Sequence, residues 1–195
     1  MPQAHVNEQK NGRRAVQPAP PHAERNPGCP LDLGWVENLR VNRSAIERRT
    51  ATLPGRRTVK QEWQAAWLLR AIECMDLTTL SGDDTPGTVQ RLCGKARQPV
   101  RADLLEALGV PALHVGAVCV YHEFVATAVA ALKGSGIPVA AVSTGFPAGL
   151  NPHALKLREI SASVADGAQE IDIVISRQYA LNGDWQALYD EVRAF

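Results

Sequence analysis

Short apolar runs and longer amphipathic segments follow one another in a regular order from residue 59 onward. The apolar runs predict four strands, at residues 74–78, 116–121, 139–143 and 171–175. Apolar stripes at helical spacing predict helices over residues 59–73, 85–96, 124–133, 153–165 and 184–194. Thr85 and Pro86 form a helix-start signal. Alternating strands and helices are typical of a parallel α/β sheet, either doubly wound or closed into a (β/α)₈ barrel.

Side chains of a strand point alternately to its two faces, so each predicted strand divides into two sets. One set is apolar and suited to packing under helices: Met75, Leu77, Val118, Val120, Ile171, Ile173 and Ile175. The other set holds the candidate chemistry: Cys74, Asp76, Thr78, Cys119 and Asp172. If this second face lines the inside of a barrel, its side chains converge.

Asp172 lies in the middle of a predicted core strand. A carboxylate there is costly unless it is paired, so it is either a structural group satisfied by backbone donors or an arginine, or a functional one. The second strand acid, Asp76, favours the functional interpretation. Asp83 and Asp84 precede a helix, and we interpret them as capping residues. The stripe of Trp63, Trp67 and Leu68 is interpreted as core.

Composition excludes several classes of function. The 195 residues carry a net charge of +1 and no apolar run long enough for a membrane helix. We therefore expect no nucleic-acid partner and no membrane partner. The four cysteines form no zinc pattern, which predicts reduced, mostly buried thiols, no metal site and a cytoplasmic protein. Seven basic residues between 40 and 60 oppose one acid, Glu47, and predict a solvated helical face rather than a phosphate site.

The first thirty residues differ from the rest of the chain. Six of the 13 prolines fall there and apolar residues are few, so we expect residues 1–30 to form a disordered tail. A transit peptide is the lesser alternative, because such segments are richer in Ser and poorer in Glu and Pro.

Several segments, in order along residues 31–195, resemble the deoxyribose-phosphate aldolase family. They are MDLTTLSGDDT (75–85), AVCVY (117–121), GFPAG (145–149) and EIDIVI (170–175). RRTVKQEWQAAWLL (56–69) and LNGDWQALYDEVRAF (181–195) are similar to the longer, animal-type branch of that family.

The resemblance implies a (β/α)₈ barrel and a class I aldolase, a lyase that needs no metal or cofactor. Such enzymes reversibly cleave 2-deoxy-D-ribose 5-phosphate to D-glyceraldehyde 3-phosphate and acetaldehyde through a lysine Schiff base, in deoxyribose phosphate catabolism. Carried over by motif, Asp172 is the proton relay, Asp76 a supporting carboxylate, and Thr78 and Cys119 line the substrate pocket. The resemblance also implies a phosphorylated sugar as partner and allows a homo-oligomer.

The chain departs from the family pattern in its lysines. The family's Schiff-base lysine lies in a motif like KTSTGK on a later strand, and no such motif is present among Lys10, Lys60, Lys95, Lys133 and Lys156. We predict that these five side chains lie in the tail or on solvated helices. Residues 31–195 are also short for a barrel of roughly 250 residues. We therefore expect them to form the N-terminal half of the barrel, with about four strand–helix units.

Two other interpretations stay open from the sequence. One is a non-catalytic half-barrel that acts only by binding partners. The other is a complete small doubly wound protein with a different ligand.

Overall fold

The computed structural model of the protein describes residues 28–56 and 59–195. Most of the predicted tail, residues 1–27, lies outside the described residues. The chain divides into two units after Pro30, and the fold below belongs to the unit Leu31–Phe195.

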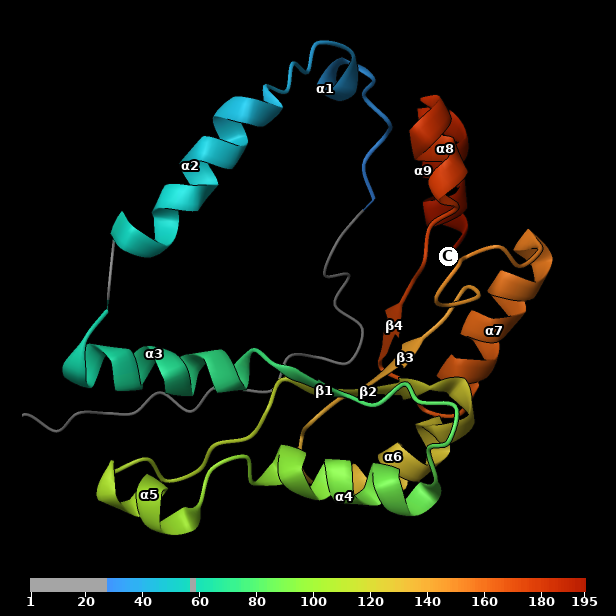
Figure 1. Ribbon diagram of the computed structural model, residues 1–195. Coiled ribbons are helices and arrows are strands. Elements are labelled where there is room, and N and C mark those ends of the chain that lie inside the picture. Colours follow the sequence, from blue (N-terminus) through green and yellow to red (C-terminus); the bar gives the residue numbers. More distant parts are fainter. Residues whose placement is uncertain (1–27, 57–58) are drawn as a thin grey trace, which may run out of the picture. The chain divides into compact units, whose positions relative to one another are not determined.

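Four parallel strands form one sheet in chain order (Figure 1). They are β1 (Asp76–Thr78), β2 (Ala117–Tyr121), β3 (Val139–Val142) and β4 (Glu170–Asp172). A doubly wound sheet reverses its strand order at a switch point, whereas successive barrel strands are always neighbours. The order β1-β2-β3-β4 is therefore that of a partial (β/α) barrel, as the family resemblance implies, and not that of the doubly wound alternative.

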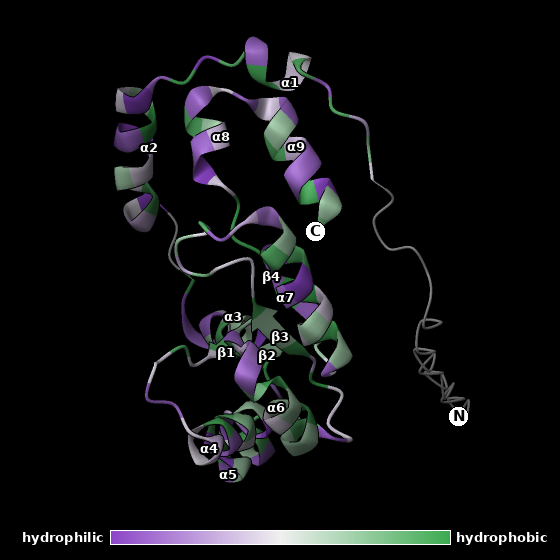
Figure 2. Ribbon diagram, turned by 90° about the vertical axis from the view of Figure 1, so that its right-hand side faces the viewer, coloured by the Kyte–Doolittle hydropathy of each residue, from purple (hydrophilic) through white to green (hydrophobic). Residues whose placement is uncertain are grey.

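Helices connect and flank these strands. Before β1 lie α1 (Gly34–Glu37), α2 (Arg43–Arg56) and α3 (Gln61–Glu73). Between the strands lie α4 (Pro86–Arg97), α5 (Ala102–Ala107), the 3₁₀ helix η1 (His122–Phe124), α6 (Val125–Leu132) and α7 (His153–Ala165). After β4 follow α8 (Arg177–Asn182) and α9 (Trp185–Ala194). Figure 2 shows hydrophilic and hydrophobic residues in both helices.

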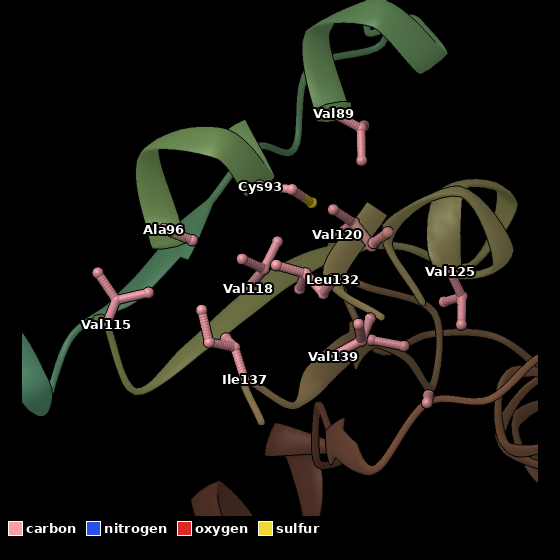
Figure 3. Packing of buried hydrophobic residues seen from close by; sticks show 13 residues of the cluster. Val89, Cys93, Ala96, Val115, Val118, Val120, Val125, Leu132, Ile137 and Val139 are labelled. Atoms are coloured by element: carbon pink, nitrogen blue, oxygen red, sulfur yellow. The ribbon is translucent and has the colours of Figure 1, made fainter. Parts of the chain in front are cut away.

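The main hydrophobic core lies between the sheet and the helices α4 and α6. Figure 3 shows Cys93 and Ala96 of α4 close to Val118 and Val120 of β2. Leu77 of β1 and Ile171 of β4 pack against the same cluster, so the predicted division of strand faces is confirmed there. A second cluster draws on β2, β3 and loops, and no residue from any helix of the described chain. Helices thus cover one face of the sheet, as in a barrel wall.

Local sequence signals explain where two of the helices begin. The Thr85 hydroxyl accepts a hydrogen bond from the Thr88 backbone N–H at 3.2 Å, and Pro86 occupies the first turn of α4. The Asp184 carboxylate accepts one from the Ala187 backbone N–H at 3.1 Å at the start of α9.

Several expectations are corrected. The predicted core stripe of α3 is wrong for the described residues, since Trp63, Trp67 and Leu68 are 67%, 62% and 58% exposed. Cys74 follows the end of α3 and precedes the strand, and it is exposed, so only Cys93 and Cys119 are buried thiols among the described residues. The short helices α5 and α8 lack a long apolar stripe and were not predicted.

The basic α2 is exposed along its whole length, which confirms the predicted solvated face. No helix in residues 28–56 or 59–195 is long and apolar enough to cross a membrane.

Candidate functional site

The sheet register places the predicted site residues on one face. Asp76 pairs with Ala117, Thr78 with Cys119, and Asp172 with Val142. Because paired residues of neighbouring strands point to the same side, Asp76, Thr78, Cys119 and Asp172 all lie on the helix-free face. Their common placement agrees with the prediction from strand parity.

The pKa of the Cys119 thiol is influenced by the other groups on this face. Its burial raises the pKa of Cys119 to about 11, and the negative charges of Asp172 and Asp76 act in the same direction. A hydrogen bond with Thr78 and one with the Val142 backbone oppose this rise. The thiol is therefore protonated at neutral pH and is a weak nucleophile, while both carboxylates lie within electrostatic reach of it.

Asp172 and Asp76 themselves are exposed on this face. Among the described residues, no hydrogen bond or ion pair is made by the Asp172 carboxylate. Within the described residues the Asp172 carboxylate is therefore solvated rather than paired. A solvated carboxylate at the end of a strand can exchange protons with a ligand through water.

Apolar side chains border the same face. Phe146, in the loop after β3, meets Tyr121 edge-to-face with ring centroids 6.0 Å apart. Leu80, from the loop after β1, packs on the same cluster as Cys119. The position of Phe146 shows that the GFPAG loop borders the helix-free face.

The loop after β1 is organised by Asp84, whose role the sequence misassigned. Asp84 does not cap α4, because Thr85 does. Its carboxylate instead accepts a bond from the Thr79 hydroxyl at 2.8 Å and one from the Ser81 backbone N–H at 3.0 Å. The Thr79 backbone N–H in turn donates to the Cys119 carbonyl at 3.2 Å. The backbone hydrogen bonding between β1 and β2 therefore extends one residue beyond Thr78, to Thr79.

The prediction that Lys156 lies on a solvated helix face is wrong, because its side chain is buried. Its side chain is 1% exposed, and Nζ donates to Glu191 Oε1 at 2.9 Å and to Ser176 Oγ at 2.8 Å. A cavity of about 140 Å³ borders these groups. Lys156 and Glu191 are 35 residues apart, so no sequence spacing announces their contact.

Metal ligands do not gather in the described part of the chain, where no three His, Cys, Asp or Glu side chains are grouped to hold an ion. The His122 ring makes other contacts, and its Nδ1 lies 3.1 Å from Ser163 Oγ. Its Nε2 lies 3.7 Å from Asp166 Oδ2.

Comparison with known proteins gives a consistent set of relatives. No protein-family profile matches the chain. It is 54% identical over 172 residues to a deoxyribose-phosphate aldolase of Bos taurus, covering 86% of this chain and 54% of the relative. The deoxyribose-phosphate aldolase of Homo sapiens is 53% identical over 174 residues, covering 87% and 55%. The chain thus spans about half the length of the curated relatives it matches.

Solved structures agree on the fold. A crystal structure from Coccidioides immitis, described as a deoxyribose-phosphate aldolase, matches with a TM-score of 0.55 and 22% identity, covering 77% of this chain and 53% of that one. An aldolase called QR15 matches with a TM-score of 0.50 and 24% identity, covering 63% and 48%.

Proposed function

We propose, because this chain is homologous to the deoxyribose-phosphate aldolases, that it forms the N-terminal half of the catalytic barrel of such an enzyme. The reaction is the reversible cleavage of 2-deoxy-D-ribose 5-phosphate to D-glyceraldehyde 3-phosphate and acetaldehyde. The observation that carries the proposal is the presence of Asp76, Thr78, Cys119 and Asp172 on the helix-free face, in a sheet wound like a barrel wall.

Asp172 is the proposed proton relay. Retro-aldol cleavage removes a proton from the hydroxyl at the bond that breaks and later returns one to the carbon of the enamine. A solvated carboxylate that acts through a water molecule suits both transfers. Asp76 supports it, and Thr78 and Cys119 are proposed to line the substrate pocket beside the apolar wall of Leu80 and Phe146.

The Schiff-base amine is proposed to come from polypeptide outside these 195 residues. The four lysines in the described ranges lie on helices or at their ends, and none is in β1–β4. A lysine amine has an ordinary pKa near 10.4 and must be deprotonated to attack a carbonyl. Lys156 is the buried one of these four, and its Nζ is engaged by Glu191 Oε1 at 2.9 Å and by Ser176 Oγ at 2.8 Å.

The proposed partners are the phosphorylated sugar and, in the assembled enzyme, further copies of the same subunit. The proposed location is the cytoplasm, where the buried thiols Cys93 and Cys119 remain reduced.

A split-enzyme experiment tests this function. The chain is co-expressed with the part of the Homo sapiens relative that lies outside the matched residues. Cleavage of 2-deoxy-D-ribose 5-phosphate is followed by a coupled NADH assay. We expect turnover from the pair and none from either chain alone.

Borohydride trapping with substrate separates the outcomes. We expect one adduct per pair, on a lysine of the human portion, and no specific adduct on this chain. A stoichiometric adduct on any of the five lysines of this chain, with turnover, would overturn the assignment of roles. A pair that assembles but never turns over would favour a half-barrel that only binds partners.

A further inference from the structure

Thr144 has an unusual backbone conformation at the point where β3 ends. Its φ is +58°, in the left-handed region that a β-branched residue rarely adopts. The residue is completely buried. An outlier of this kind persists only where its surroundings impose it, and such positions cluster at functional sites.

The Thr144 hydroxyl contacts both backbone groups of Val174. Oγ1 accepts a hydrogen bond from the Val174 N–H at 2.6 Å. Its single hydrogen can be donated to the Val174 carbonyl at 2.9 Å or to its neighbour, the Ser143 carbonyl, at 2.8 Å. One side chain thus satisfies backbone groups that would otherwise be left without a ladder partner.

These contacts continue the sheet past the end of β4. The last backbone rung between the two strands is Ser143 N–H to the Asp172 carbonyl, at 2.9 Å. Val142 is paired with Asp172, so the next position on the same face pairs Thr144 with Val174. The backbone turns away at Thr144, and the hydroxyl takes the place of the missing rung.

Val174 is confined from a second side by Gly149. A Cβ on that glycine would lie 2.7 Å from Val174 Cγ1 and 3.0 Å from the Ile175 carbonyl oxygen. The loop after β3 therefore holds the segment that follows Asp172. The backbone is held at the Asp172 carbonyl by the Ser143 N–H, and again at Val174 by the Thr144 hydroxyl.

We propose that Thr144 is a positioning residue whose hydroxyl keeps the Asp172 carboxylate on the helix-free face that also carries Cys119. The catalytic role of Asp172 rests on the proposed function. The position of its carboxylate on this face does not. Thr144 acts through Val174 and touches no reacting group.

The test compares Thr144→Val, which keeps the shape but removes the hydroxyl, with Thr144→Ser, which keeps the hydroxyl. The first measurement, on the 195-residue chain, is amide hydrogen exchange of Val174 by NMR. We expect at least about tenfold faster exchange in Thr144→Val and a change below about threefold in Thr144→Ser, since only the first removes the acceptor.

The second measurement is the pH profile of Cys119 alkylation by iodoacetamide, resolved from the other cysteines by peptide mass spectrometry. The charge of Asp172 contributes to the protonated state of this thiol. We expect Asp172→Asn to speed alkylation about threefold near pH 8.5, because the thiolate is the reacting form. Thr144→Val has a similar effect, and the double variant is no faster than Asp172→Asn alone.

Each alternative result counts against the proposal. Normal Val174 protection in Thr144→Val overturns it, as does an unchanged Cys119 profile in either single variant. Fully additive effects in the double variant mean that the hydroxyl affects thiol burial rather than Asp172. If Thr144→Val does not fold, lost Val174 protection in the folded Thr144→Ser protein still refutes it, whereas retained protection supports it. Neither measurement uses aldolase turnover. An inactive split enzyme would therefore contradict the proposed function without affecting the test of Thr144.

Discussion

The ammonium group of Lys156, on α7, lies 2.9 Å from Oε1 of Glu191, on α9, and both side chains are buried. Ser176 completes the cluster, because its backbone N–H and its hydroxyl donate to Glu191 at 2.7 and 2.6 Å. The Phe195 ring covers the ammonium with its centroid 5.7 Å away. Two helices and the segment after β4 are therefore held together by one charged pair.

Replacing Lys156 by Met should strongly destabilise the protein. The change leaves Glu191 buried without its counter-charge, which costs about 3–5 kcal/mol in comparable buried pairs. The free energy of unfolding in urea measures it. Lys95→Met, an exposed change in α4, is the control and should alter stability by less than about 0.5 kcal/mol.

A second variant separates charge from packing. Adding Glu191→Gln to Lys156→Met removes the uncompensated charge and should recover part of the lost stability. No recovery would mean that the lysine stem, rather than the ion pair, supplies the stabilisation.

The same pair predicts a pH dependence. Burial acts to raise the pKa of the Glu191 carboxyl, but hydrogen bonds from Ser176 and the nearby charge of Lys156 outweigh it and lower that pKa. A group whose pKa is lower in the folded state stabilises the fold above its unfolded pKa, near 4.5. That contribution is lost as the pH falls through the folded value.

The measurement is the unfolding midpoint as a function of pH between about 7 and 3. The wild-type midpoint should fall more steeply below about pH 4.5 than that of Glu191→Gln. Parallel curves for the two proteins would exclude Glu191 as a source of the acid sensitivity.

Gly149 is predicted to tolerate no side chain. Its φ of +70° is unfavourable for other residues, and a Cβ would meet Val174 at 2.7 Å. Gly109 has a similar φ of +67°, and a Cβ there would have no atom within 4 Å, so Gly109→Ala measures the backbone effect alone. We expect Gly149→Ala to cost about 1–3 kcal/mol more than Gly109→Ala in unfolding experiments. Equal losses would show that the loop shifts freely away from Val174.

Asp172→Asn should impair catalysis in the split enzyme. Loss of a general acid–base group typically lowers turnover on the order of 10²-fold or more. The coupled assay gives kcat, and circular dichroism checks that the fold is kept. Near-normal turnover with an intact fold would assign Asp172 a structural role.

The positions of the strands and the division of their faces could be predicted because they depend on local patterns, whereas their order followed only from the family resemblance. Val118 and Val120 alternate with Cys119, and this period fixes which side each one occupies whatever the rest of the chain does. The start of α4 was equally local, since Thr85 and Pro86 carry the signal themselves.

Features that depend on distant partners could not be predicted. The ammonium of a lysine in an amphipathic helix is ordinarily exposed to solvent. Lys156 can be buried because its charge is paired with Glu191, which belongs to another helix. Asp84 was misassigned for a related reason. Its position fits a cap, but Thr85 holds that role and the carboxylate turns back to Thr79 instead.

The alternation of β2 also affects how the protein can change over evolutionary time. Val118 and Val120 contact the helices, so replacing them disturbs packing that many other residues share. Cys119, between them, faces the other way and contacts neighbours of a different kind. Neighbouring positions are therefore constrained independently, and a substitution at Cys119 can change the helix-free face without disturbing the packing of Val118 and Val120 against the helices.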